Sequence, residues 1–211
     1  MFPRLPPATR ALIVANVLMY VAQSLTAQPT QTLEAGWLTE LLALQPIGPD
    51  FHLWQLVTYA FLHGSIWHIF FNMFALYMFG GALEVYWGVS RFLQYYFASV
   101  VAAGGVQLAS TWLSGSYEST IGASGGVFGL LLAFGFNFPR QRILLLFPPI
   151  PMPAWLFVTL YGVIELFFGV TGIEANVAHF AHLGGMVGGA LMMLWWRLED
   201  RLRRSRGPPS W

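Results

Sequence analysis

Six stretches of the chain are almost continuously apolar, and most charged and turn-forming residues gather between them. The stretches cover residues 10–26, 66–83, 91–113, 122–138, 153–173 and 177–197. Each is long enough, or nearly so, to cross a hydrocarbon core about 30 Å thick as an α-helix. Their apolar residues do not alternate with a period of two, as the strands of a transmembrane β-barrel do. The pattern therefore predicts an all-α membrane protein with a bundle of six transmembrane helices.

Short segments flank the bundle at both ends. We expect residues 1–9 to form a cytoplasmic N-terminal tail, residues 10–198 the membrane domain, and residues 199–211 a basic cytoplasmic C-terminal tail. The first 27 residues also loosely resemble a signal peptide, because two arginines and an apolar run precede Thr26-Ala27. That alternative leaves the orientation of the other five spans unchanged.

Composition narrows the class of protein further. Hydrophobic residues make up 56% of the 211 residues and charged residues 9%, whereas about 25% of an average soluble domain is charged. The chain has no cysteine, which excludes disulfides, a thiol nucleophile and thiolate metal ligands. A net charge of +1 gives no basic surface for nucleic acid.

The basic residues predict the orientation. All of them are arginines, and with six spans they fall on one side: Arg4, Arg10, Arg91, Arg140, Arg142, Arg197, Arg201, Arg203, Arg204 and Arg206. Positive residues collect on the cytoplasmic side of membrane proteins, so both termini are expected there. The other side contains only acidic charges: Glu34, Glu40, Asp50, Glu118 and Glu174.

The first outer connection, residues 27–65, is unusually long for a compact bundle. Its amphipathic pieces at residues 37–42 and 51–54 predict short helices lying partly in the outer interface. A ligand-binding loop is the alternative, and the sequence does not separate the two.

Polar residues within the spans are few, and most lie at one depth. His68 and Asn72 are in the second span, Ser124 begins the fourth, and His182 is in the sixth. Since these three spans all run from the outer to the inner side, the four side chains fall in one layer near the outer side. Polar groups at membrane depth are costly and often functional.

Each group also has a simpler explanation when taken alone. Ser124 would serve as a small residue for close helix packing, and His68 with Asn72 as a hydrogen-bonding pair between helices. Glu165 in the fifth span would be a buried carboxyl bonded to a neighbouring helix. A metal site remains a further alternative, with Glu165 joined by His68 and His182, or by His179 and His182.

The combination points to acyl transfer. A serine is a weak nucleophile until a base accepts its proton, and His182 can be that base if the fourth and sixth spans pack closely. Gly125 and Gly129 on one span and Gly185 and Gly189 on the other would permit this approach.

The surroundings of this pair are predicted from spacing. Phe128, four residues after Ser124, is expected to pack against the imidazole. The spans contain no aspartate, which favours a Ser–His dyad over a triad. His68, the Asn72 amide and the backbone N–H of Ser124 would form an oxyanion hole.

Three motifs resemble those of the rhomboid intramembrane serine proteases: His68-Ile-Phe-Phe-Asn72, Gly122-Ala-Ser124-Gly125 and Ala181-His182-Leu-Gly-Gly185-Met-Val-Gly-Gly189. The resemblance covers the six-helix core and the long first loop. It implies a water-accessible cavity that opens outward, with Ser124 as nucleophile and His182 as general base. His68 and Asn72 then match the oxyanion-side residues, and Gly122, Gly125, Phe128, Gly185 and Gly189 support them.

By the same resemblance, the substrates are single-pass membrane proteins cut in or near the membrane. The sequence has no thiolate ligand, Walker loop or dinucleotide fingerprint, so we expect activity without metal or cofactor. The bilayer would be a bacterial inner membrane. Two positions depart from the family: Gln55 follows Trp54 where many relatives have arginine, and Phe128 replaces a tyrosine common in bacterial relatives. The alternatives are a catalytically inactive rhomboid-like protein that binds membrane clients and, less favoured, a small transporter using Glu165 and the histidines as a proton relay.

Overall fold

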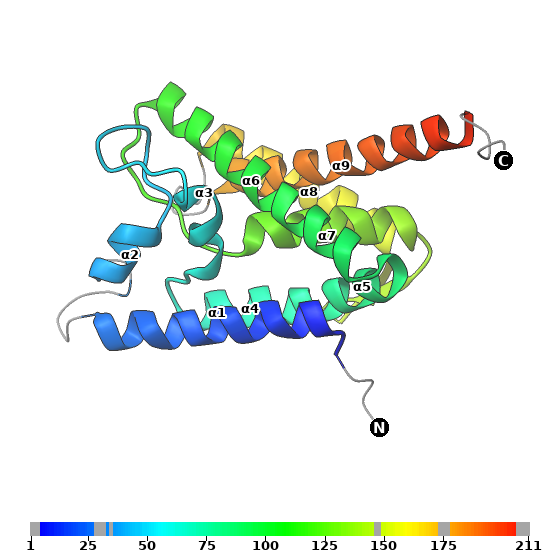
Figure 1. Cartoon of the computed structure of the whole chain (residues 1–211), viewed down its shortest axis with the longest axis horizontal. Helices are drawn as coiled ribbons and strands as arrows, with labels where there is room; N and C mark the ends of the chain where they lie inside the picture. Colours follow the sequence, from blue (N-terminus) through cyan, green and yellow to red (C-terminus); the bar gives the residue numbers. More distant parts are fainter. Residues whose placement is uncertain (1–4, 28–32, 34–35, 146–148, 173–177, 206–211) are drawn as a thin grey trace, which may run out of the picture.

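Long helices form most of the molecule and lie side by side in Figure 1. This computed structural model describes residues 5–27, 33, 36–145, 149–172 and 178–205. The helices are α1 (Pro7–Thr26), α2 (Trp37–Leu42), α3 (Gln55–Thr58), the 3₁₀ turn η2 (Tyr59–Phe61), α4 (Ile66–Ala75), the π-helical segment η3 (Leu76–Gly80), α5 (Gly81–Trp87), α6 (Val89–Ser114), α7 (Ser124–Asn137), α8 (Ala154–Thr171) and α9 (His179–Ser205).

One small element departs from the all-α prediction. Strands β1 (Arg142–Leu144) and β2 (Pro151–Pro153) pair antiparallel between α7 and α8. Three alternating prolines, Pro149, Pro151 and Pro153, exclude a helix here because each lacks the backbone N–H that a helix needs. The hairpin lies outside the predicted spans except at Pro153.

Within the described residues, four helical segments are long and apolar enough to cross a membrane: Pro7–Thr26, Ile66–Trp87, Val89–Ser114 and Ala154–Thr171. Helix α7 is apolar but has only 14 residues, a length of about 21 Å at 1.5 Å per residue. Helix α9 is long, but the glycines and histidines of its first half lower its mean hydropathy. It is therefore less apolar than the four segments above. The count of six spans therefore stays a prediction.

The arrangement of the helix ends agrees with an even number of crossings. The start of α1 and the end of α9 lie at one end of the bundle, and α2 and α3 lie at the other (Figure 1). Near the termini, Arg91 at the start of α6 lies 3.4 Å from Asp200 of α9. Which end faces the cytoplasm stays a prediction.

The predicted boundary at residue 198 falls inside a helix. Helix α9 continues to Ser205, seven residues into the predicted basic tail of residues 199–211. An ion pair of Glu199 with Arg203, 2.6 Å apart at i and i+4, supports this extra helical length. The charged residues thus extend the last helix instead of ending it.

Helix α7 is central, with α6, α8 and α9 packed against it. Two fully buried tyrosines form hydrogen bonds among α7 and the elements around it. The Tyr59 hydroxyl of η2 donates to the Val100 carbonyl at 2.8 Å, and the Tyr95 hydroxyl of α6 donates to the Gly129 carbonyl at 2.8 Å. These bonds join η2 to α6 and α6 to α7.

A buried carboxylate holds the start of α1. Glu84 of α5, 3% exposed, accepts hydrogen bonds from the backbone N–H of Ala8 at 2.9 Å and from the backbone N–H and hydroxyl of Thr9 at 2.6 and 2.7 Å. The first N–H groups of a helix have no partner within the helix, and a negative charge is favourable there. Glu84 therefore joins α1 to the second long helix.

We expect Glu84→Ala to lower the free energy of unfolding by about 3 kcal/mol, because it leaves buried donors unpaired. Thermal or denaturant unfolding in detergent micelles measures this change. Glu199→Ala is the matched control, since its exposed ion pair contributes only about 0.3–0.5 kcal/mol. Equal stability losses in the two variants would contradict this role of Glu84.

The first outer connection contains one short helix where it was predicted and one displaced by several residues. Helix α2 covers residues 37–42, but Phe51–Trp54 is not helical and α3 begins at Gln55. Gln55 is fully buried, with its side-chain oxygen accepting from the N–H of Gln45 at 3.2 Å and of His52 at 3.1 Å. Its amide nitrogen donates to the carbonyls of Leu41 and Asp50 at 3.4 and 3.1 Å. The glutamine thus binds four backbone groups of this loop.

Candidate active site

Ser124 is the first residue of α7, and a glycine brings it close to α4. Gly122 has φ +128°, a conformation that side chains rarely adopt, and its N–H donates to the Tyr59 carbonyl at 2.9 Å. A Cβ on Gly122 would lie 2.7 Å from Nε2 of His68. The segment before α7 can approach His68 only because this position is a glycine.

The structure brings Ser124 and His182 together. The Ser124 Oγ lies 2.8 Å from Nε2 of His182, which belongs to the first turn of α9. Phe128 stacks on the imidazole with ring centroids 4.3 Å apart and an interplanar angle of 6°. The phenyl ring therefore fixes the plane of the imidazole while leaving its nitrogens accessible.

Glycines allow this approach, although only part of the predicted ridge is used. A Cβ on Gly185 would collide with the carbonyl oxygen of Gly125, so α7 and α9 are in backbone contact one turn below His182. The expectation that Gly189 faces α7 is wrong, because a Cβ there would meet the Tyr95 hydroxyl of α6. A Cβ on Gly129 would lie 3.1 Å from the Gly185 carbonyl oxygen, but its closest neighbour would be Ser99 of α6.

Glu165 is bonded to a neighbouring helix, and its partners are two histidines that the sequence grouped with it only as metal ligands. Its Oε2 lies 2.8 Å from Nδ1 of His182 and 2.8 Å from Nδ1 of His179. All three residues are buried, the carboxylate coming from α8 and the imidazoles from α9. The prediction of a dyad considered only aspartate as a third member, whereas the structure places a glutamate against the far side of the imidazole.

These three residues are also the arrangement that resembles a metal site. Their ligand atoms lie within 4.8 Å of one another, and His68 is not part of the group. Both imidazoles approach the same carboxylate oxygen at hydrogen-bond distance. Hydrogen bonding therefore accounts for the cluster without an ion.

His68 and Asn72 share one face of α4 beside Ser124. The N–H of Gly64 approaches Nδ1 of His68 at 3.4 Å, and Asn72 donates one amide hydrogen to the His68 carbonyl at 2.9 Å. The buried His63 ring lies against that of His68, with centroids 5.0 Å apart. Burial lowers the pKa of His63 to about 3, so this neighbour is uncharged at neutral pH.

A cavity of about 1530 Å³ connects these groups, since His68, Asn72, Ser124 and His182 all line it. Much of the remaining wall is aromatic, including Phe70, Phe71, Phe74, Phe157 and Tyr161. A site of this size with a few convergent polar groups has the form of a binding pocket for an extended apolar ligand.

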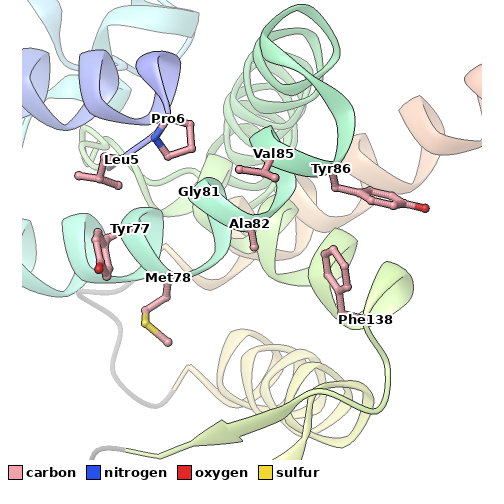
Figure 2. A pocket seen from close by; sticks show the side chains of 9 residues that line it. All are labelled: Leu5, Pro6, Tyr77, Met78, Gly81, Ala82, Val85, Tyr86 and Phe138. Atoms are coloured by element: carbon pink, nitrogen blue, oxygen red, sulfur yellow. The ribbon is translucent and has the colours of Figure 1, made fainter. Parts of the chain in front are cut away.

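A second hollow of about 660 Å³ lies elsewhere, between the start of α1, the η3–α5 segment and the end of α7. Figure 2 shows its lining, which includes Leu5, Val85 and Phe138. The described residues that line it include no carboxylate, imidazole or serine. Of these two cavities, the larger one therefore holds the candidate chemical groups.

We expect Asn72→Ala to lower kcat by about 10²-fold with little change in KM, because an oxyanion donor acts mainly in the transition state. Steady-state cleavage of a membrane-embedded substrate measures both constants. Asn72→Asp is a useful companion, since it keeps the shape but removes the donor. A change confined to KM would make Asn72 a substrate-binding residue instead.

Comparison with known proteins decides the family. The sequence matches the Rhomboid domain over residues 50–198, more than half of the chain. The chain belongs to the rhomboid family. The resemblance of its three motifs is thereby confirmed, and with its apolar helices this rhomboid is an integral membrane protein.

Curated relatives agree with the assignment to the rhomboid family. Rhomboid protein 1, mitochondrial, of Saccharomyces cerevisiae is 33% identical over 152 residues, covering 70% of this chain and 42% of the yeast protein. Rhomboid protease GlpG of Pectobacterium atrosepticum is 26% identical over 189 residues, covering 90% of this chain and 62% of that protein. Rhomboid protease GlpG of Salmonella choleraesuis is 26% identical over 204 residues. This rhomboid thus spans about two fifths of the yeast relative and three fifths of the Pectobacterium one.

Proposed function

We propose that this rhomboid is an intramembrane serine endopeptidase, with Ser124 as nucleophile and His182 as general base. The observation that carries the proposal is the 2.8 Å separation of Ser124 Oγ and His182 Nε2 inside a cavity. A hydroxyl within hydrogen-bond reach of an imidazole is the geometry that nucleophilic activation requires. Relatives named as proteases support the same function.

The reaction proceeds in two halves. His182 Nε2 takes the hydroxyl proton as Ser124 Oγ attacks the scissile carbonyl carbon, and the carbonyl electron pair moves to the oxygen. Collapse of this tetrahedral intermediate breaks the C–N bond, and the imidazolium gives its proton to the leaving amine. Water then attacks the acyl-enzyme with the same proton transfers in turn, which releases the acid and restores Ser124.

The negative oxygen of the intermediate needs donors. Ser124 begins α7, so its N–H has no acceptor within the helix and is free for this role. Asn72 keeps a second amide hydrogen beside the one that it gives to the His68 carbonyl. His68 lies against the Gly122–Ser124 segment and is the third candidate donor.

The aromatic walls of the cavity suit a transmembrane segment in extended form, since an extended peptide exposes the amide that a helix shields. We therefore propose single-pass membrane proteins as substrates, cut in or near the membrane, with no metal or cofactor. The proposed topology has six spans, both termini in the cytoplasm and the cavity opening outward from a bacterial inner membrane. Because α7 has only 14 residues, we expect Ser124 at its start to lie below the surface of such a membrane.

A serine-reactive fluorophosphonate tests the proposal directly. The purified protein in micelles is expected to become labelled, and in vesicles it should cleave a tagged single-pass substrate. Absence of both labelling and cleavage, with substrate still co-purifying, would favour the inactive client-binding protein instead.

A further inference from the structure

The His179–Glu165–His182 cluster has no assigned role in the reaction as described. It combines two contacts of 2.8 Å to one carboxylate oxygen, Oε2 of Glu165. The three residues are 5–8% exposed and belong to α8 and α9. Such a buried carboxylate needs charge-assisted donors to offset its desolvation.

The direction of the bonds determines which nitrogen of His182 carries the proton. A carboxylate only accepts, so His182 donates from Nδ1–H to Glu165. In a neutral imidazole the other nitrogen, Nε2, is then the acceptor, and this is the nitrogen that faces Ser124 Oγ. The opposite tautomer would present Nε2–H to the hydroxyl and could not take its proton.

From this geometry we infer that Glu165 is a positioning residue for His182, an inference that rests on the proposed protease function. The carboxylate holds the imidazole in the tautomer that acts as a base. When Ser124 transfers its proton to Nε2, the proton on Nδ1 stays on His182 and Glu165 stays ionised. Its bond to the new imidazolium then joins two opposite charges, which stabilises the transition state. The three residues thereby form a Ser–His–Glu triad whose acid is supplied by α8.

His179 supports the same carboxylate. It lies one turn before His182 on α9 and donates its Nδ1–H to the oxygen that His182 uses. The second donor fixes the oxygen and supplies part of the stabilisation that a buried charge requires. Its own Nε2 is buried without a hydrogen-bond partner among the described residues, and His179 does not line the cavity of Ser124, so it acts through Glu165.

A purely structural function, in which the cluster only joins α8 to α9, predicts a different result. Removing a structural contact lowers stability and affects substrate binding and chemistry together. Removing a positioning carboxylate lowers kcat and the rate of fluorophosphonate labelling in parallel, at temperatures where the variant is fully folded, and leaves KM nearly unchanged.

Glu165→Gln is the decisive variant because it keeps the shape and removes the charge. We expect kcat and the labelling rate to fall by about 10²-fold or more, since the corresponding change in a serine-protease triad costs about 10⁴-fold. Glu199→Gln, the same change at a remote acid of α9, should leave both rates unchanged. In protein labelled with ¹⁵N-histidine, the low-field proton of the His182 Nδ1–H···carboxylate bond should be present in Ser124→Ala and absent in Glu165→Gln.

The role of His179 is tested by a matched pair of substitutions. Asn has an amide nitrogen at the position of Nδ1, so His179→Asn should retain most of the activity, whereas His179→Leu should lose about 10–100-fold, as when other supporting groups are removed.

If Glu165→Gln labels as fast as the parent, the inference is wrong although the protease function stands. If the parent itself neither labels nor cleaves, the proposed function fails first. Loss of labelling with a chelator and its return with zinc would make these residues metal ligands and overturn the assignment.

Discussion

Ser124→Ala and His182→Ala are each expected to reduce cleavage of a membrane-embedded substrate below detection while leaving the fold intact. The two side chains lie within hydrogen-bond reach at 2.8 Å, and the proposed proton transfer needs both of them. In a well-studied serine protease, loss of either partner lowers kcat by about 10⁶-fold. Substrate cleavage in vesicles and fluorophosphonate labelling measure the two effects independently.

The double variant provides the control. Because the residues act as one unit, Ser124→Ala/His182→Ala should be hardly slower than either single variant. Thermal unfolding should show that all three remain folded. Substantial cleavage by Ser124→Ala would remove Ser124 from the reaction and refute the protease proposal.

Gly185→Val is the second change with a large expected effect, although Gly185 has no chemistry of its own. Even its first added carbon would overlap the Gly125 carbonyl, so α7 and α9 would have to separate. A displacement of about 1 Å between base and nucleophile can cost 10²-fold in rate. We therefore expect labelling of Gly185→Val to be undetectable, with a lower unfolding temperature.

A milder variant, Gly185→Ala, and a control variant at Gly105 accompany Gly185→Val. Gly185→Ala adds one carbon and should still fold, with labelling slowed by about 10²-fold. Gly105 of α6 has open space around its Cβ position, so Gly105→Val is the matched control and should label at the parent rate. Gly172 is unsuitable as a control because its φ of +69° strains any side chain. Parent-like labelling of Gly185→Val would show that this contact does not align the pair.

The candidate site could be assembled from the sequence because each of its parts was visible there. The arginines predicted which way each span runs, and the direction of three spans placed Ser124 and His182 in one layer. Glycine spacing then predicted the close approach of α7 and α9, which the contact of Gly125 with Gly185 bears out geometrically. The roles of these residues stay predictions.

Contacts between side chains far apart in sequence were not predictable in the same way. Glu165 was one polar residue in an apolar span, and the sequence does not say which helix face it occupies or which residues it meets. The same holds for Gln55, whose four backbone partners lie on a folded loop, and for Gly189, whose nearest neighbour depends on the rotation of α9. Periodicity predicts helices, but packing decides these partners.

The π-helical segment η3 sets the directions in which side chains before and after it point, so the number of residues in the second long helix matters as well as their identity. Asn72 and Glu84 are both buried polar residues, one beside Ser124 and the other at the start of α1. On an uninterrupted α-helix, side chains twelve positions apart point about 120° apart around the axis. The additional residue that a π-turn accommodates removes about 100° of that difference. Deleting any one residue of Leu76–Gly80 would therefore turn one of these two side chains away from its partner, even if every remaining residue were kept.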